Sequence, residues 1–242
     1  PAGAKLGWDE ALAREDSDVV GNVLVKRQTS YVARIGGDAT GQSLGRYRFV
    51  NNTIVVQPGG SAVFRLFDQL QSVEMHNNVI LVNGTGTPNV LRANTAEMSW
   101  VGGVRRISGS NNWVTAAATN IPTEWTGTVQ GASPGLLNGA LNDVRPAVGS
   151  PLINAGLGVT ASPTGAPFPN PLALPLFHPP QRAFQSASAA APRPDAGAVD
   201  IGAFEFTVDG GTGGGAGGGT GGAGGGSGGG SGGTGGSGGG TS

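Results

Sequence analysis

Short apolar runs rich in β-branched residues dominate the first half of the chain. Residues 23–25, 54–56 and 79–82 form such runs, and Gly, Asn, Thr and Pro residues separate them. Apolar runs of this length between turn-forming residues predict short strands joined by tight turns. The pattern therefore indicates a mainly β protein.

Two series of polar residues recur together along these predicted strands. An Asn recurs at positions 22, 52, 78 and 112, with separations of 30, 26 and 34 residues. An Arg recurs between them at positions 34, 65 and 92, with separations of 31 and 27 residues. Two series that advance in step indicate one structural repeat of variable length.

Each repeat has room for three short strands, for example at residues 62–67, 73–76 and 79–82. Three strands in a repeat of this length predict a parallel β-solenoid, in which each coil pairs with the coils above and below. Asn at a corner between strands tolerates left-handed backbone angles and forms local hydrogen bonds. We therefore expect the stacked Asn side chains to bond to one another from coil to coil.

The repeat resembles a known family. The segments NNTIV at 51–55 and HNNVI at 76–80 resemble coils of bacterial right-handed parallel β-helix proteins, the pectate-lyase-like class. The segments GSPLINAG at 149–156 and DAGAVDIGAFE at 195–205 resemble the paired signature that closes such domains. The resemblance implies an all-β, right-handed parallel β-helix from a secreted or surface-attached protein, in a class that includes polysaccharide-degrading members.

This resemblance divides the chain into four parts. Residues 1–17 are an irregular opening segment of a truncated β-helix, and residues 18–156 are its coils. Residues 157–206, with nine prolines between 157 and 194, are a Pro-rich loop and a closing strand that cap the open end. We expect the closing strand at residues 200–206.

The fourth part, residues 207–242, is predicted to be a disordered Gly/Ser/Thr linker. From residue 210 onward it contains only Gly, Ser, Thr and Ala, and 23 of the 47 glycines lie there. Such a segment cannot bury enough apolar surface to offset its ordering entropy. We interpret it as a flexible tether.

Charge and composition exclude several function classes. Only 12% of residues are charged and the formal net charge is −1, so no general basic surface for nucleic acid is expected. No apolar run approaches the roughly 18 residues that span a bilayer. With no Cys and only two His, we expect no cofactor and no multi-histidine metal site. Ca²⁺ held by Asp or Glu is the alternative, although no loop concentrates carboxylates. We expect a monomer.

The Arg series supplies the candidate binding residues. Period-two alternation turns the neighbouring apolar residues inward, so Arg34, Arg65 and Arg92 are predicted to point outward in one column. An extended acidic polysaccharide would match this column, because guanidinium groups bind carboxylates in a bidentate fork. The alternative is a solvated ladder in which the arginines pair with Asp38 or Asp68.

A second predicted outward column contains the candidate catalytic residues. Aligning the repeats places Asp18, Arg48, Glu74 and Ser108 side by side, and His76 shares the face of Glu74. Arg48, Glu74 and His76 together would suit proton abstraction beside a uronate carboxyl, as in polysaccharide lyases. The alternative is a structural cluster of cross-coil ion pairs on the surface.

The sequence thus predicts an extracellular or cell-surface β-helix protein that binds or degrades polysaccharide. If it is an enzyme, the chemistry is lyase-type β-elimination or glycoside hydrolysis. A non-catalytic surface or adhesin stalk, tethered by the Gly-rich tail, is the alternative hypothesis from a different functional class.

Overall fold

The computed structural model describes residues 16–26, 31–37, 43–56, 62–67, 69–93, 100–141, 143–180, 190–195 and 197–207. The chain separates into a first unit, Pro1–Gly211, and a second unit, Thr212–Ser242. All described residues belong to the first unit. Most of the predicted opening segment, nearly all of the predicted linker, and Asp38 and Asp68 lie outside the described residues.

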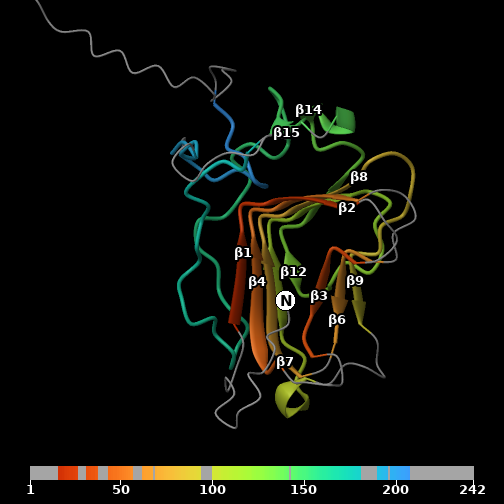
Figure 1. The fold of residues 1–242 in the computed structure, drawn as a ribbon, viewed down its shortest axis with the longest axis vertical. Coiled ribbons are helices and arrows are strands. Elements are labelled where there is room, and N and C mark those ends of the chain that lie inside the picture. Colours follow the sequence, from red (N-terminus) through yellow and green to blue (C-terminus); the bar gives the residue numbers. More distant parts are fainter. Residues whose placement is uncertain are drawn as a thin grey trace, which may run out of the picture. The chain divides into compact units, whose positions relative to one another are not determined.

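Most described strands belong to three parallel sheets (Figure 1). The first sheet contains β1 (Asp16–Val20), β4 (Gly45–Val50), β7 (Leu70–His76), β10 (Ile107–Ser110) and β12 (Trp125–Thr126). The second contains β2 (Val23–Lys26), β5 (Thr53–Val56), β8 (Val79–Val82), β11 (Trp113–Thr115) and β13 (Val129–Gly131). The third contains β3 (Ala33–Ile35), β6 (Phe64–Leu66) and β9 (Leu91–Ala93).

The chain visits the three sheets in a repeating order, from the first to the second to the third. Each strand pairs in parallel with the equivalent strand of the next repeat, so that Val19 lies beside Phe49 and Phe49 beside Met75. The prediction of stacked parallel strands is therefore confirmed.

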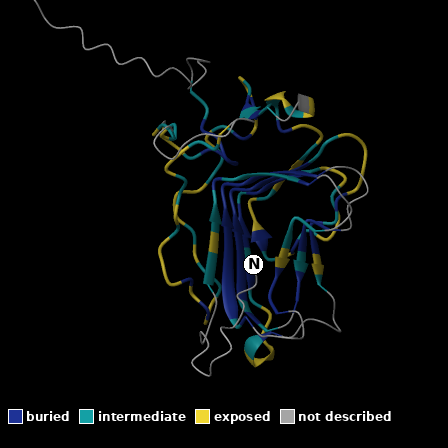
Figure 2. Ribbon diagram, in the orientation of Figure 1, coloured by how far each residue is buried: buried dark blue, intermediate teal, exposed yellow. Residues whose placement is uncertain are grey.

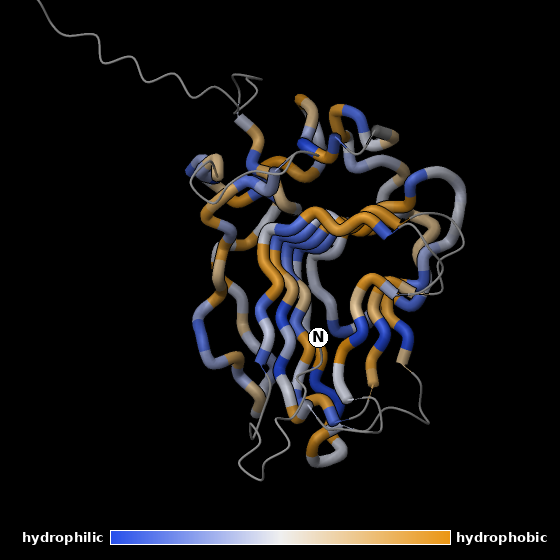
Figure 3. The backbone as a smooth tube through the Cα atoms, viewed as in Figure 1, coloured by the Kyte–Doolittle hydropathy of each residue, from blue (hydrophilic) through white to orange (hydrophobic). Residues whose placement is uncertain are grey.

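A ladder of asparagines forms the corner between the first and second sheets, which is hydrophilic in Figure 3. The Asn52 side chain donates to Asn78 Oδ1 at 2.9 Å, and the Asn78 side chain donates to Asn112 Oδ1 at 3.1 Å. Asn77, one residue before Asn78, has the left-handed φ of 56° that turns the corner. Asn22 donates to Asn52 in the same way. The predicted Asn ladder is confirmed.

The second sheet is buried on both faces, which accounts for its continuous apolar runs. Ile54 and Ile80 point into the core that the three sheets enclose, whereas Val55 and Val79 belong to a second apolar cluster on the other face. A sheet buried on both faces needs apolar residues at successive positions. Figure 2 shows the central strands of the first and second sheets as buried.

The closing signature covers this second face. Leu152, Ile201, Ala203 and Phe204 pack in the same cluster as Val55 and Val79 of the second sheet. The sequence predicted a cap over the open end of the stack, and this part of the prediction is wrong. The signature lies along the side of the strand stack, because the second sheet has an apolar outer face to bury.

The closing strand predicted at residues 200–206 does not form. Residues 201–203 are bends, and Gly202 has a φ of 100° that only glycine adopts readily. A Cβ at Gly202 would lie 2.8 Å from Thr53 Oγ1, so the backbone itself presses against β5. The segment is held by single bonds such as Ala203 N to Thr53 Oγ1, at 3.0 Å, in place of a strand ladder.

The remaining regular elements are short. β14 (Leu136–Asn138) and β15 (Asp143–Pro146) form an antiparallel pair, and the helical turns of the described ranges are η1 (Val101–Gly103) and η2 (Gly139–Leu141). Beyond them, the Pro-rich segment runs along the outer face of the first sheet (Figure 1). No described residue of this segment pairs as a strand with that sheet.

Candidate functional site

The three series arginines lie side by side on the third sheet. Arg34 pairs in register with Arg65, and Arg65 with Arg92. Their neighbours Ile35, Leu66 and Leu91 are buried, whereas Arg34 and Arg92 are exposed and Arg65 is half-buried. The predicted outward column of arginines is therefore present.

Two aromatic rings hold part of this column. The guanidinium carbon of Arg34 lies 4.0 Å from the centre of the Phe67 ring, and that of Arg65 lies 4.7 Å from the same ring. Arg65 also lies 4.9 Å from the Tyr31 ring centre and donates to the Tyr31 hydroxyl. These cation–π contacts orient the guanidinium groups and restrict their freedom to fan apart. No sequence pattern predicted Tyr31 or Phe67 as part of this column.

The second predicted column also forms, on the outer face of the first sheet. Asp18 pairs with Arg48, Arg48 with Glu74, and Glu74 with Ser108. Arg48 forms an ion pair with Asp18 through Nε, at 3.0 Å, and a parallel pair joins Arg46 to Asp16. These are the cross-coil ion pairs that alternating charges predicted.

The outer face of the first sheet is not open to solvent, contrary to the sequence-based expectation. Arg48, Glu74 and His76 are 2%, 1% and 1% exposed. The Pro-rich segment covers Arg48, whose guanidinium donates to the carbonyl oxygens of Asn170 and Pro171 at 3.0 Å each. Phe168 stacks on the same guanidinium at 4.0 Å. Proline has no backbone N–H, so a proline-rich segment leaves carbonyl oxygens available, and here they accept hydrogen bonds from a buried cation.

His76 joins two neighbours in a hydrogen-bonded relay. Its Nδ1 lies 2.9 Å from Ser110 Oγ, and its Nε2 lies 3.4 Å from Glu74 Oε2. Arg48 contacts Asp18 and the covering segment instead. Of the three predicted catalytic residues, the structure therefore joins Glu74 and His76, and it adds Ser110. Its alignment with His76 in the repeat was the available sequence signal.

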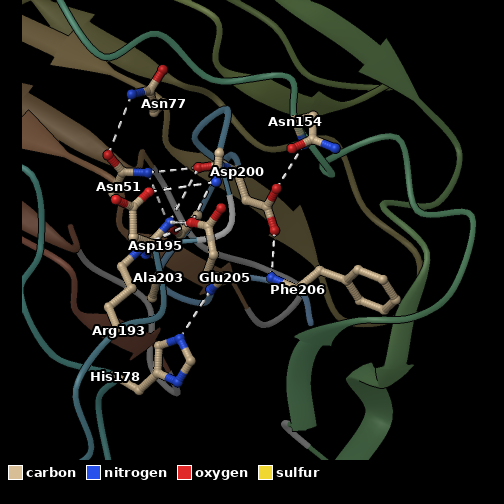
Figure 4. Close-up of polar contacts among 12 residues, drawn as sticks. Asn51, Asn77, Asn154, His178, Arg193, Asp195, Asp200, Ala203, Glu205 and Phe206 are labelled. Atoms are coloured by element: carbon tan, nitrogen blue, oxygen red, sulfur yellow. Dashed lines mark hydrogen bonds and ion pairs between the residues drawn. The ribbon is translucent and has the colours of Figure 1, made fainter. Parts of the chain in front are cut away.

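A third group of buried polar residues lies in the closing segment (Figure 4). The Asp200 carboxylate accepts the backbone N–H groups of Asn154 and Phe206, both at 2.6 Å. Arg193 forms a buried ion pair with Glu205 at 2.7 Å. Burial raises the pKa values of Asp200 and Glu205, while Arg193 opposes both shifts. These contacts join parts of the closing region to one another, and the Asn51 side chain donates to the Asp200 carbonyl at 2.7 Å.

His178 belongs to the same group. Its Nε2 accepts the Glu205 backbone N–H at 3.1 Å, which requires that nitrogen to be unprotonated. Burial, together with Arg193 and Arg145, lowers the pKa of His178 to about 4. His178 therefore acts as a neutral structural acceptor near pH 7.

The described ranges contain neither clustered metal ligands nor a membrane-spanning helix. Within those ranges, no three His, Cys, Asp or Glu side chains gather as metal ligands would. The described part of the chain also contains no helix long and apolar enough to cross a membrane.

Comparison with known proteins gives no relative: no family model, no curated protein and no solved structure matches this chain. Functional inference therefore depends on the geometry described above.

Proposed function

We propose that this chain is part of a right-handed parallel β-helix protein of the pectate-lyase-like type, extracellular or at the cell surface, that binds an acidic polysaccharide. The binding surface is the column of Arg34, Arg65 and Arg92 on the third sheet. The observation that carries the proposal is the in-register stacking of three guanidinium groups on consecutive strands.

Electrostatics favours an anionic ligand there. Neighbouring strands lie about 4.8 Å apart, and two unit charges at that distance repel by about 1 kcal/mol in bulk water and about 3 kcal/mol at a protein surface. Contacts with Phe67 and Tyr31 limit how far the groups of Arg34 and Arg65 spread. A polymer with a carboxylate on each sugar would place an anion beside successive guanidinium groups and accept bidentate hydrogen bonds from them.

Binding without cleavage is the form of the proposal that the geometry favours. The candidate lyase residues Arg48, Glu74 and His76 are buried on another sheet, so a glycan on the arginine column does not reach them. Release of unsaturated uronate products from polygalacturonate, alginate or pectin tests the lyase hypothesis directly. Steady formation of these products by the protein would overturn the binding-only form.

The binding test uses polygalacturonate and alginate in a titration at low and high salt. We expect Arg65→Ala with Arg92→Ala to weaken binding at least 10-fold. The matched control, Arg105→Ala with Arg145→Ala, removes two cations that pair with Glu124 and Asp143, and should bind nearly as well as the parent. The single substitution Arg92→Ala, at an exposed residue, tests the column while leaving the half-buried Arg65 in place.

Equal loss in the test and control pairs would show only a general charge effect and would refute a specific column. Absence of binding to every acidic glycan would favour the alternative, a non-catalytic surface or adhesin stalk.

A further inference from the structure

The hydrogen-bonded relay on the first sheet supports an activity unrelated to glycan binding on the third sheet. We propose that Ser110, His76 and Glu74 form a nucleophile–base–acid triad that hydrolyses short-chain carboxylic esters of polyhydroxy alcohols. The central observation is that one imidazole contacts a serine hydroxyl through Nδ1, at 2.9 Å, and a carboxylate through Nε2, at 3.4 Å.

Strand pairing sets this geometry. Glu74 and His76 are two residues apart on β7, so both side chains leave the same face of the sheet. Ser110 on β10 is the register partner of His76. The imidazole therefore lies between the carboxylate along its own strand and the hydroxyl on the next strand.

The hydrogen-bond roles fit base catalysis. With Nε2 protonated and donating to Glu74, Nδ1 is free to accept the Ser110 proton. Glu74 then stabilises the imidazolium that forms, as the carboxylate does in serine hydrolases generally. In this arrangement Ser110 and His76 are catalytic residues, and Glu74 positions the imidazole.

Buried polar atoms without a protein partner surround the relay. Glu74 Oε1 and Ser72 Oγ belong to residues that are 1% and 0% exposed, and neither atom forms a hydrogen bond. Ser108 Oγ, on the register partner of Glu74, is a third such atom. A buried polar group that lacks a partner loses about 1–3 kcal/mol of hydrogen bonding. A polyhydroxy alcohol would satisfy all three, which is the basis for the substrate class.

The first part of the Pro-rich segment has two described contacts near the strands of the relay. Leu157 exchanges two hydrogen bonds with the Asn77 side chain at the end of β7, at 2.8 and 2.9 Å. A Cβ at Gly165 would lie 3.8 Å from Arg106 Nε, so the segment runs from the end of β7, at Leu157, to the Arg106 side chain just before β10. Two hydrogen bonds lie within this part of the segment: Ala166 N donates to Pro163 O, and Phe168 N donates to Ser162 Oγ. Ser110 is only 7% exposed, so the proposal requires residues 158–164, here called the strap, to move before an ester reaches Ser110.

The reaction balances in two steps. Ser110 Oγ attacks the ester carbonyl carbon while its proton passes to His76 Nδ1. The ester C–O bond then breaks, and the alcohol leaves with that proton. Water next attacks the acylated Ser110 and gives its proton to His76, after which the carboxylic acid leaves and the Ser110 hydroxyl is restored.

A fluorophosphonate probe, which attaches covalently to activated serines, tests the proposal in the full chain. We expect one adduct, mapped to Ser110 by mass spectrometry, and slow hydrolysis of p-nitrophenyl acetate. Ser110→Ala should abolish both, and His76→Ala should slow both by 100-fold or more. Ser133→Ala, which removes an exposed serine hydroxyl outside the relay, should still form the adduct.

Two variants of the strap test whether the covering segment prevents labelling of Ser110 in the parent. Asn77→Gly keeps the left-handed backbone and removes both bonds to Leu157, while Pro163→Gly loosens the strap without touching the sheet. Either should speed labelling of Ser110. Labelling that persists in His76→Ala, or no adduct in the parent and in both folded strap variants, would overturn the proposal. Neither result affects glycan binding by the arginine column.

Discussion

The Asn ladder makes a sharp stability prediction at Asn78, in its middle. Asn78 is fully buried, and its side chain takes part in four hydrogen bonds. Its Nδ2 donates to Asn112 Oδ1 at 3.1 Å and to the Phe49 carbonyl at 2.9 Å. Its Oδ1 accepts from the backbone N and the side-chain Nδ2 of Asn52, at 3.0 and 2.9 Å.

Asn78→Ala removes all four bonds and leaves the partner groups buried. Each lost bond costs about 1 kcal/mol, and more where a buried partner finds no substitute. We therefore expect the free energy of unfolding to fall by about 3–5 kcal/mol. Asn78 itself has no left-handed backbone, so alanine adds no strain.

Asn22→Ala, at the first corner of the ladder, is the matched control. Its side chain donates two bonds, to Asn52 Oδ1 at 3.2 Å and to the Val20 carbonyl at 3.0 Å, in partly buried surroundings. We expect a loss of about 1 kcal/mol. Urea unfolding followed by tryptophan fluorescence measures both variants. Equal losses at Asn78 and Asn22 would refute the view that a central amide stabilises the coils on both sides.

Two further predictions concern the closing segment. Gly202→Ala should destabilise the protein by about 2 kcal/mol or more, because a Cβ would meet Thr53 Oγ1 at 2.8 Å and the φ is 100°. Gly197→Ala has a similar φ of 102° but open space around its Cβ, so calorimetry should show a smaller loss; equal losses would contradict a role for the contact. The lowered pKa of His178, about 4 against an ordinary 6.5, means that the unfolded chain binds a proton first on acidification. The stability contributed by neutral His178 in the folded protein is thus fully present above pH 6.5 and is lost as the pH falls toward 4. Melting temperatures of the parent and His178→Gln should converge as the pH falls across this range, because only the parent loses the His178 contribution. The raised pKa values of Asp200 and Glu205 have the opposite effect on stability, but they affect both proteins alike and cancel in the difference. A constant difference would refute the assignment.

The sequence alone determined the repeat and its local consequences. Asn and Arg recur with the coil, so the Asn ladder and the arginine column follow from the spacing of single residues along the chain. Once the repeats pair in parallel, equivalent positions lie side by side, so the repeat spacing is enough to predict which residues are neighbours. The runs at 54–56 and 79–82 likewise indicated strands, because β-branched residues suit a buried sheet.

Only the tertiary structure decided what covers the sheets. A residue that points away from the core of a coil is ordinarily exposed, and this expectation held for Arg34 and Arg92. It failed for Arg48, Glu74 and His76, which are all buried. The Pro-rich segment, 122 residues later in the chain at Asn170, covers Arg48. The closing strand predicted at residues 200–206 also does not form, because the apolar outer face of the second sheet holds a bent segment in place. Packing between parts distant in sequence depends on shape and burial, which local spacing does not encode.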